Sequence, residues 1–153
     1  MIFKPLKKVK DMNIKAPVST IMTTDLMMVK TDDKVVVVRD IMEANGIHHV
    51  PVVNFNKLVG LISKSDLLHF LKGMNYNSYQ DLMNDVRLKN YTAEEIMTED
   101  LECLQPEDSI EKAIELFQKN RFHSIPIVKE NNALVGILTT FDILNMIVEK
   151  VNV

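Results

Sequence analysis

The sequence contains two copies of one pattern, and this repeat constrains the fold more than any other feature. Three phrases recur in the same order: "IMTTDL" (21–26) and "IMTEDL" (96–101), "HHVPVV" (48–53) and "HSIPIV" (123–128), and "LVGLISKSDLL" (58–68) and "LVGILTTFDIL" (134–144). The copies lie 75 residues apart for the first two phrases (96 minus 21) and 76 for the third (134 minus 58), because one residue is added after Asn132. Such a repeat is one supersecondary unit written twice. The chain therefore has two structurally equivalent halves.

The size and composition of the chain fit an ordinary folded protein. Its 153 residues allow one compact domain or two small halves that share a core. Charged residues make up 25% of the chain and apolar residues 46%, which is typical of a soluble globular protein. The net charge of −3 is small and no segment forms a basic stripe, so a nucleic-acid partner is not expected.

The cysteine content and the first segment bear on cellular location. Cys103 is the single cysteine, so it cannot form an internal disulfide, which fits a reducing cytoplasm. Residues 1–16 contain five lysines but not the apolar core of a signal peptide, and no stretch reaches the roughly 18 apolar residues of a membrane span. We expect a cytoplasmic protein with no membrane partner and a solvated N-terminal arm; contact of that arm with an anionic surface is the alternative.

The repeat decides the secondary structure of a valine-rich segment. Val35–Val38 would favour a strand from its β-branched side chains alone. The equivalent segment of the second half follows Ser109, an N-cap candidate, and has apolar residues at the helical spacing i, i+3, i+4 and i+7: Ile110, Ala113, Ile114 and Phe117. Equivalent segments share one fold. We therefore predict a helix over Asp33–Ala44, with these residues inward: Val35, Val38, Ile41 and Met42.

Each half is predicted to be β-α-β-β-α. The expected strands are Met28–Lys30, Val50–Val53 and Leu58–Ile62 in the first half, followed by a helix from Ser65, and the second half starts with a strand at Cys103–Gln105. The fold class is α+β (α/β), with two such repeats packed about a pseudo-twofold axis, because neither half can bury a core alone. We divide the chain into an arm (1–16), a first repeat (17–72), a connector with room for one helix (73–92) and a second repeat (93–150).

The repeated phrases resemble a known family. "IMT", "H-x-x-P-[VI]-V" and "LVG-x-x-[ST]-x-x-D", each present twice and in order, are similar to the tandem cystathionine-β-synthase (CBS) domain pair, also called a Bateman module, over about residues 17–150. The resemblance implies two related clefts between the repeats that commonly bind adenosine-containing ligands. It also implies pairing of two modules, as a homodimer, into a flat disc. The ligand is then AMP, ADP or ATP, with S-adenosylmethionine, NAD or a cyclic dinucleotide as alternatives.

Two phrases that end in a carboxylate, "GLISKSD" (60–66) and "GILTTFD" (136–142), carry the predicted chemistry. The start of a helix presents unpaired N–H groups that attract a phosphate, and a carboxylate can accept both vicinal hydroxyls of a ribose. From the spacing alone, a capping box that closes the helix end is favoured. The resemblance favours ribose binding by Asp66 and Asp142 instead. The two roles are compatible in one residue.

Further candidates surround these carboxylates. The hydroxyls on the phosphate or ribose side are Ser63, Ser65, Thr139 and Thr140. In the second half Phe141 replaces Ser65, so the second cleft is expected to take a different ligand or to be empty. In phosphate-binding members of the family, such as the γ subunit of AMP-activated kinase, basic side chains at the histidine positions reach the phosphates, which carries that role over to these residues: His48, His49 and His123.

The remaining candidates concern an adenine slot and a metal site. Adenine needs an apolar slot with polar backbone groups, for which the candidates are Ile47, Pro51, Phe122 and Pro126 with the turns at Thr23 and Thr98. A metal site is disfavoured, because neighbouring histidines on an extended segment point to opposite faces and no third ligand lies nearby in the sequence.

These observations lead to one expected function and two alternatives. We expect a stand-alone, energy-sensing regulatory module that binds adenine nucleotide and passes its occupancy to an unknown effector protein. An enzyme is disfavoured, because the carboxylates occur once per repeat and no P-loop phrase is present. The other alternative is a structural dimerisation module with vestigial clefts, in which Asp66 and Asp142 serve helix stability alone.

Overall fold

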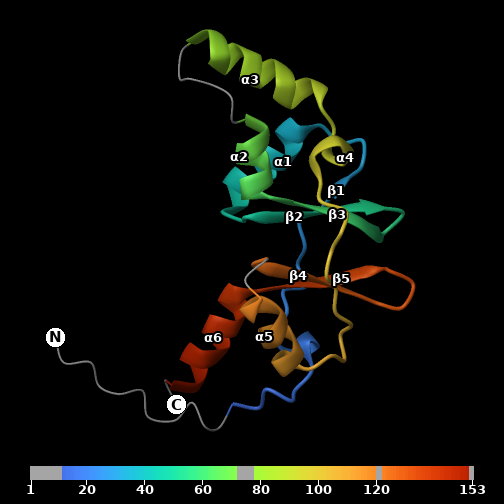
Figure 1. The fold of residues 1–153 in the computed structure, drawn as a ribbon, viewed down its shortest axis with the longest axis vertical. Coiled ribbons are helices and arrows are strands. Elements are labelled where there is room, and N and C mark those ends of the chain that lie inside the picture. The colour runs from blue at the N-terminus through green and yellow to red at the C-terminus, as the bar shows by residue number, and fades with distance from the viewer. Residues whose placement is uncertain (1–11, 72–77, 120–121, 152–153) are drawn as a thin grey trace, which may run out of the picture. The chain divides into compact units, whose positions relative to one another are not determined.

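The computed structural model describes residues 12–71, 78–119 and 122–151 (Figure 1). The fold is mixed α/β, as predicted. In chain order its elements are the 3-10 helix η1 (Val18–Thr20), β1 (Val29–Lys30), α1 (Val35–Asn45), β2 (His49–Asn54), β3 (Lys57–Ser63), α2 (Lys64–Leu71), α3 (Ser78–Asn90), α4 (Ala93–Ile96), α5 (Ile110–Gln118), β4 (Ser124–Val128), β5 (Leu134–Thr139) and α6 (Thr140–Val151). They belong to two compact units: unit 1 comes from Met1–Leu26, Glu102–Glu130 and Val135–Val153, and unit 2 from Met27–Leu101 and Asn131–Leu134.

Unit 2 is built on a three-stranded sheet. The strand order is β1-β2-β3, with β1 parallel to β2 and β2 antiparallel to β3. Helix α1 makes the crossover that a parallel pair requires. Helices α1 and α2 lie on the same side of this sheet, and α3 packs against α1 (Figure 1). The core between helices and sheet includes these buried residues: Val35, Val38, Met42, Val50, Val52, Ile62 and Leu67.

Unit 1 has a smaller, two-stranded sheet, β4-β5, with α5 and α6 on one side of it (Figure 1). Its core consists of these buried residues: Val18, Leu104, Ile110, Ala113, Ile125, Ile127, Leu138 and Met146. The predicted strand at Cys103–Gln105 is wrong, because Leu104 forms a single parallel bridge, to Ile127. Gln105 is followed by Pro106, which has no amide hydrogen to continue the pairing, whereas Thr31 holds the equivalent position after β1.

Each repeat contributes its leading segment to the unit of the other repeat. The backbone bridges that show this, in equivalent pairs, are Pro17–Ser109 with Thr92–Lys34, and Thr23–Ile137 with Thr98–Leu61. The first bridge of each pair lies in unit 1 and the second in unit 2. The "IMT" phrase of one repeat therefore runs beside the glycine-containing strand of the other. The compact units do not coincide with the sequence repeats.

The valine-rich segment is a helix, as the repeat predicts. Helix α1 begins at Val35, two residues later than predicted; the Asp33 carboxylate belongs to the turn before it and accepts from the Lys30 amide at 2.7 Å. Three of its four predicted inward residues are buried and the fourth, Ile41, packs against the same core. In α5 the hydroxyl of Ser109 accepts from the Lys112 amide at 3.2 Å, which confirms the predicted N-cap.

The connector contains a helix, α3, as predicted. Leu88 buries its side chain in the core of unit 2, where it is 3% exposed. Arg39 on α1 forms an ion pair with Asp85 at 3.7 Å, and the Arg87 guanidinium lies 5.1 Å from the ring centre of Phe70 on α2. These contacts attach α3 to both neighbouring helices. No helix among the described residues, α3 included, is long and apolar enough to cross a membrane.

Candidate functional site

In unit 2, the carboxylate of Asp66 closes the start of helix α2. Its Oδ2 atom accepts from the amide of Ser63 at 2.7 Å and from the hydroxyl of the same residue at 2.7 Å. In return, the Ser63 hydroxyl oxygen accepts from the Asp66 amide at 3.0 Å. This reciprocal pair is a capping box, the arrangement that the spacing alone predicts. It holds a half-buried carboxylate where β3 passes into α2.

In unit 1, Asp142 closes the start of helix α6 in the same way. Its Oδ2 atom accepts from the amide of Thr139 at 2.6 Å and from the Thr139 hydroxyl at 2.7 Å, and the Asp142 amide donates back at 3.3 Å. One further bond is present here: the Thr23 hydroxyl donates to Asp142 Oδ1 at 3.3 Å. Thr23 reaches this carboxylate because its segment is exchanged between the repeats. The sequence predicted Thr23 only as part of an adenine slot.

The two site glycines make room for a methionine of the exchanged segment. A Cβ atom added at Gly60 would lie 2.7 Å from Cγ and 2.9 Å from Cβ of Met97, and one added at Gly136 would lie 3.1 Å from Cγ of Met22. Such distances require the methionine to move. The glycines therefore allow "IMT" to lie directly on the strand that leads into each capping box.

The first amides of both helices are already bonded within the protein. The Lys64 amide donates to the carbonyl oxygen of His48 at 2.8 Å, and the Thr140 amide donates to that of His123 at 3.3 Å. The third amide of each helix bonds to the capping-box hydroxyl. The second amide of each helix thus lies between two amides that are already hydrogen-bonded. The predicted phosphate site therefore has fewer N–H donors than the start of an uncapped helix.

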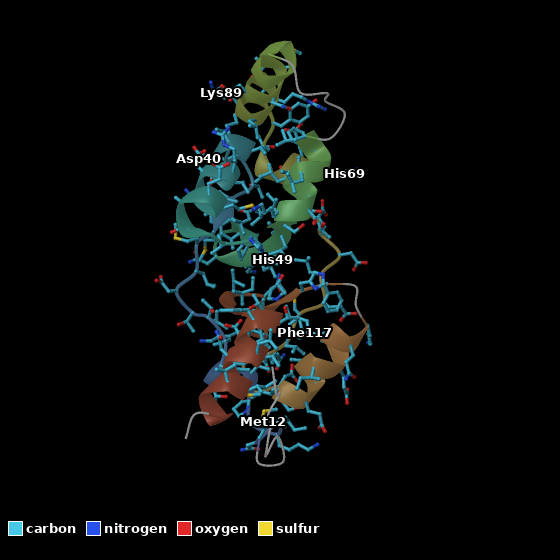
Figure 2. The ribbon with its side chains drawn as sticks, turned by 90° about the vertical axis from the view of Figure 1, so that its left-hand side faces the viewer. Met12, Asp40, His49, His69, Lys89 and Phe117 are labelled. Atoms are coloured by element: carbon cyan, nitrogen blue, oxygen red, sulfur yellow. The ribbon has the colours of Figure 1, made fainter. Side chains whose placement is uncertain are left out.

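The histidine side chains are distributed over different elements. His48 and His123 are exposed, whereas His49 is half-buried on β2. The fourth histidine, His69, lies on α2, away from His49 (Figure 2). Within the described ranges, no three His, Cys, Asp or Glu side chains gather closely enough to hold a metal ion.

The remaining candidates differ in exposure. Exposed polar candidates are Thr23, Ser65, Thr98 and Thr140, and Ser63 and Thr139 are half-buried. Of the predicted adenine-slot residues, Ile47 and Phe122 are half-buried, whereas Pro51 and Pro126 are buried. Phe141, which replaces the Ser65 hydroxyl, is 67% exposed. The two loops thus share their backbone and capping box but differ on the solvent side.

Cys103 is half-buried beside Leu104. Burial, together with the neighbouring Glu102 carboxylate, raises the pKa of the Cys103 thiol above its ordinary value. The thiol therefore stays protonated at neutral pH, which is the unreactive form of cysteine.

Comparison with known protein families identifies the family of this chain. The CBS domain family matches it twice, at residues 18–73 and 93–149. The chain belongs to the CBS domain family. The two matched ranges contain one copy each of the repeated phrases, and the exchange of leading segments between repeats is how this CBS pair builds its two units.

This CBS pair is similar to parts of longer proteins and to other CBS pairs. Inosine-5′-monophosphate dehydrogenase of Methanocaldococcus jannaschii is 34% identical over 121 residues, which are 78% of this chain and 21% of that enzyme. The solved structure of MJ1225 from the same organism has a TM-score of 0.74 at 27% identity, covering 88% of this chain and 48% of that one. The solved structure of CBSX2 in complex with AMP has a TM-score of 0.73 at 25% identity, covering 88% of this chain and 98% of that one. The chain thus spans about a fifth of the dehydrogenase and about half of MJ1225.

Proposed function

We propose that this CBS pair is a regulatory module that binds an adenosine-containing ligand of the AMP, ADP or ATP type at Asp66 and Asp142. The observation that carries the proposal is that the two oxygen atoms of each carboxylate are used differently. Oδ2 is used by the capping box, and Oδ1 retains acceptor capacity beyond the box. A ribose offers two adjacent hydroxyl donors. Capping and ribose binding then use different oxygen atoms of one residue.

The surroundings of the carboxylates support a nucleotide. The exposed hydroxyls of Ser65 and Thr140, and the exposed imidazoles of His48 and His123, are donors beside the helix starts. A CBS pair of similar length and fold, CBSX2, was solved in complex with AMP. We therefore assign ribose to the carboxylates and phosphate to the hydroxyl and imidazole side.

We assign this module a regulatory role and no catalytic step. The half-buried carboxylates are engaged in helix capping, and the raised pKa of the Cys103 thiol disfavours a thiolate nucleophile. Ligand occupancy would then be passed to a separate effector protein by a change in conformation or association.

We further propose that the module pairs with a second copy through α6. Three side chains at the spacing i, i+3 and i+7, here called the α6 stripe, are 67%, 58% and 56% exposed: Phe141, Leu144 and Val148. Large apolar groups gathered in this way are typical of an interaction surface. The stripe is uncharged, so two copies can face each other about a twofold axis without opposing like charges. Unit 2 exposes Leu68, the equivalent of Leu144, to 51%.

Isothermal titration of the ligand-stripped protein tests the ligand. The panel is AMP, ADP, ATP, S-adenosylmethionine, NAD and a cyclic dinucleotide. We expect binding by an adenine nucleotide that is weakened in Asp66→Ala and in Asp142→Ala. Asp33→Ala is the matched control, because Asp33 also accepts a backbone amide (from Lys30, 2.7 Å) but lies outside the site. A folded protein that binds no member of the panel would favour the structural dimerisation module.

Sedimentation velocity tests the pairing. We expect the sedimentation coefficient to rise with protein concentration, and this rise to be lost in Leu144→Ser. Phe55→Ser is the control, because Phe55 is 94% exposed but lies in the β2–β3 turn. A monomer at all concentrations, or equal effects of the two variants, would contradict the α6 assignment.

A further inference from the structure

The two carboxylates do not have the same number of hydrogen bonds. Among the described residues, Asp66 accepts two, both at Oδ2 and both from Ser63. Asp142 accepts the equivalent two from Thr139 and a third, at Oδ1, from the Thr23 hydroxyl. Thr98 occupies the position equivalent to Thr23, yet within the described residues no hydrogen bond joins it to Asp66. The third bond is thus a property of one loop.

This difference changes what each carboxylate can still accept. An ionised carboxylate has about four lone-pair positions, two on each oxygen. Two remain at Asp66 Oδ1, which matches the two donors of a vicinal ribose diol. At Asp142 the Thr23 hydroxyl occupies one of the two lone-pair positions of Oδ1. One ribose hydroxyl can then bond to this oxygen only after the Thr23 side chain has rotated away from it. The solvent sides of the two loops also differ in the order of their side chains: Lys64 and Ser65 in unit 2 stand where Thr140 and Phe141 stand in unit 1, so each loop has one exposed hydroxyl but at a different position.

We propose that the two adenosine sites of this module are unequal, that the site at Asp66 is the tighter, and that Thr23 weakens the site at Asp142 by competing with the ribose for its carboxylate. The inference rests on the proposed function. The module then responds over two concentration ranges: the site at Asp66 binds ligand at low concentration, and the site at Asp142 binds it only at higher concentration. A single net hydrogen bond corresponds to about a 2- to 12-fold difference in Kd.

Single-site proteins test the inequality. AMP is titrated calorimetrically into the wild type, Asp66→Asn and Asp142→Asn, in which the asparagine oxygen can still accept the capping bonds. Asp142→Asn is expected to keep the tighter site, and Asp66→Asn the weaker one, with Kd values about 2- to 12-fold apart. The order is reversed, or the two values are equal, if the inference is wrong. Failure of AMP, ADP and ATP to bind the folded wild type would overturn the proposed function itself.

Two matched threonine variants test the mechanism. Thr23→Val, made in Asp66→Asn, removes the competing hydroxyl with little change in shape and is expected to tighten AMP binding at Asp142 by about 2- to 12-fold. Thr98→Val, made in Asp142→Asn, retains the backbone groups of the Thr98 turn and removes no hydrogen bond to Asp66, so it is expected not to tighten AMP binding there. Replacing AMP by 2′-deoxy-AMP should weaken binding more at Asp66, which takes both hydroxyls, than at Asp142. Equal effects of the two threonine variants would overturn the role of Thr23, whatever the absolute affinities.

Discussion

The two carboxylate loops, Ser63–Asp66 and Thr139–Asp142, share one backbone arrangement and differ in their surroundings. Both contain a capping box, both follow a glycine overlaid by a methionine, and both bond the first helix amide to a histidine carbonyl. They differ in the extra bond from Thr23 and in the exchange of a serine for an exposed phenylalanine at the helix start. The parts that make the fold are thus preserved in both copies, whereas the parts that a ligand or partner would meet have diverged.

The largest expected effect concerns the glycines. Gly60→Ala should lower the free energy of unfolding by about 1–3 kcal/mol, the usual cost of overpacking. Gly136→Ala should cost less. The methyl group added at Gly60 would lie 2.9 Å from Cβ of Met97, whereas the one added at Gly136 would lie 3.1 Å from the more mobile Cγ of Met22 and 3.2 Å from the backbone oxygen of Thr23, so smaller shifts relieve it. Urea unfolding followed by circular dichroism measures both. Adding Met97→Ala to Gly60→Ala should restore part of the loss; no recovery would show that the methionine is not the obstacle.

The capping boxes should give the next largest effect. Asp66→Ala and Asp142→Ala remove equivalent caps, and each should cost about 0.5–2 kcal/mol of unfolding free energy without ligand. The loss in Asp142→Ala should be at least as large as that in Asp66→Ala, because it also removes the bond from Thr23. Thermal unfolding of the ligand-free proteins measures the order. Variants as stable as the wild type would mean that the carboxylates serve ligand binding alone.

The smallest effect concerns an acid-sensitive turn of unit 1. Burial of Asp108 raises its carboxyl pKa, but the hydrogen bonds from Lys112 and from the Gln105 amide outweigh it, so the folded pKa lies below the ordinary value of 3.8. A lowered carboxyl pKa stabilises the fold above the ordinary value, and this stability is lost as the pH falls through the folded pKa. Asp108→Asn should therefore unfold with a shallower dependence on pH below about pH 4.

The partner of this carboxylate supplies the control for that measurement. Lys112→Met should raise the pKa of Asp108 and move its acid-induced loss of stability to higher pH, whereas Lys119→Met, at an exposed lysine beyond the end of the same helix, should not. Acid unfolding curves that coincide for the wild type and Asp108→Asn would contradict the assignment.

Several features were predictable from the sequence because they depend on local spacing or on the repeat. The helix at Val35–Asn45 is predictable only from the repeat, which aligns its four valines with the amphipathic segment after Ser109. The box at Ser63 and Asp66 follows from a hydroxyl and a carboxylate three residues apart. The predicted strand at Cys103–Gln105 is wrong, since Pro106, just outside the segment, has no amide hydrogen to extend the pairing beyond the bridge at Leu104.

The amino-acid order alone thus establishes two equivalent halves, their main helices and strands, and a carboxylate at each strand-to-helix junction, because repetition and periodicity are visible in neighbouring residues. It does not reveal that each "IMT" segment packs in the unit of the other repeat. Both copies of the phrase are nearly identical, so the sequence has no signal for which strand each one joins. Only the tertiary structure brings Met97 onto Gly60 and Thr23 onto Asp142, since these contacts depend on the path of the whole chain. The proposed inequality of the two sites follows from that exchange.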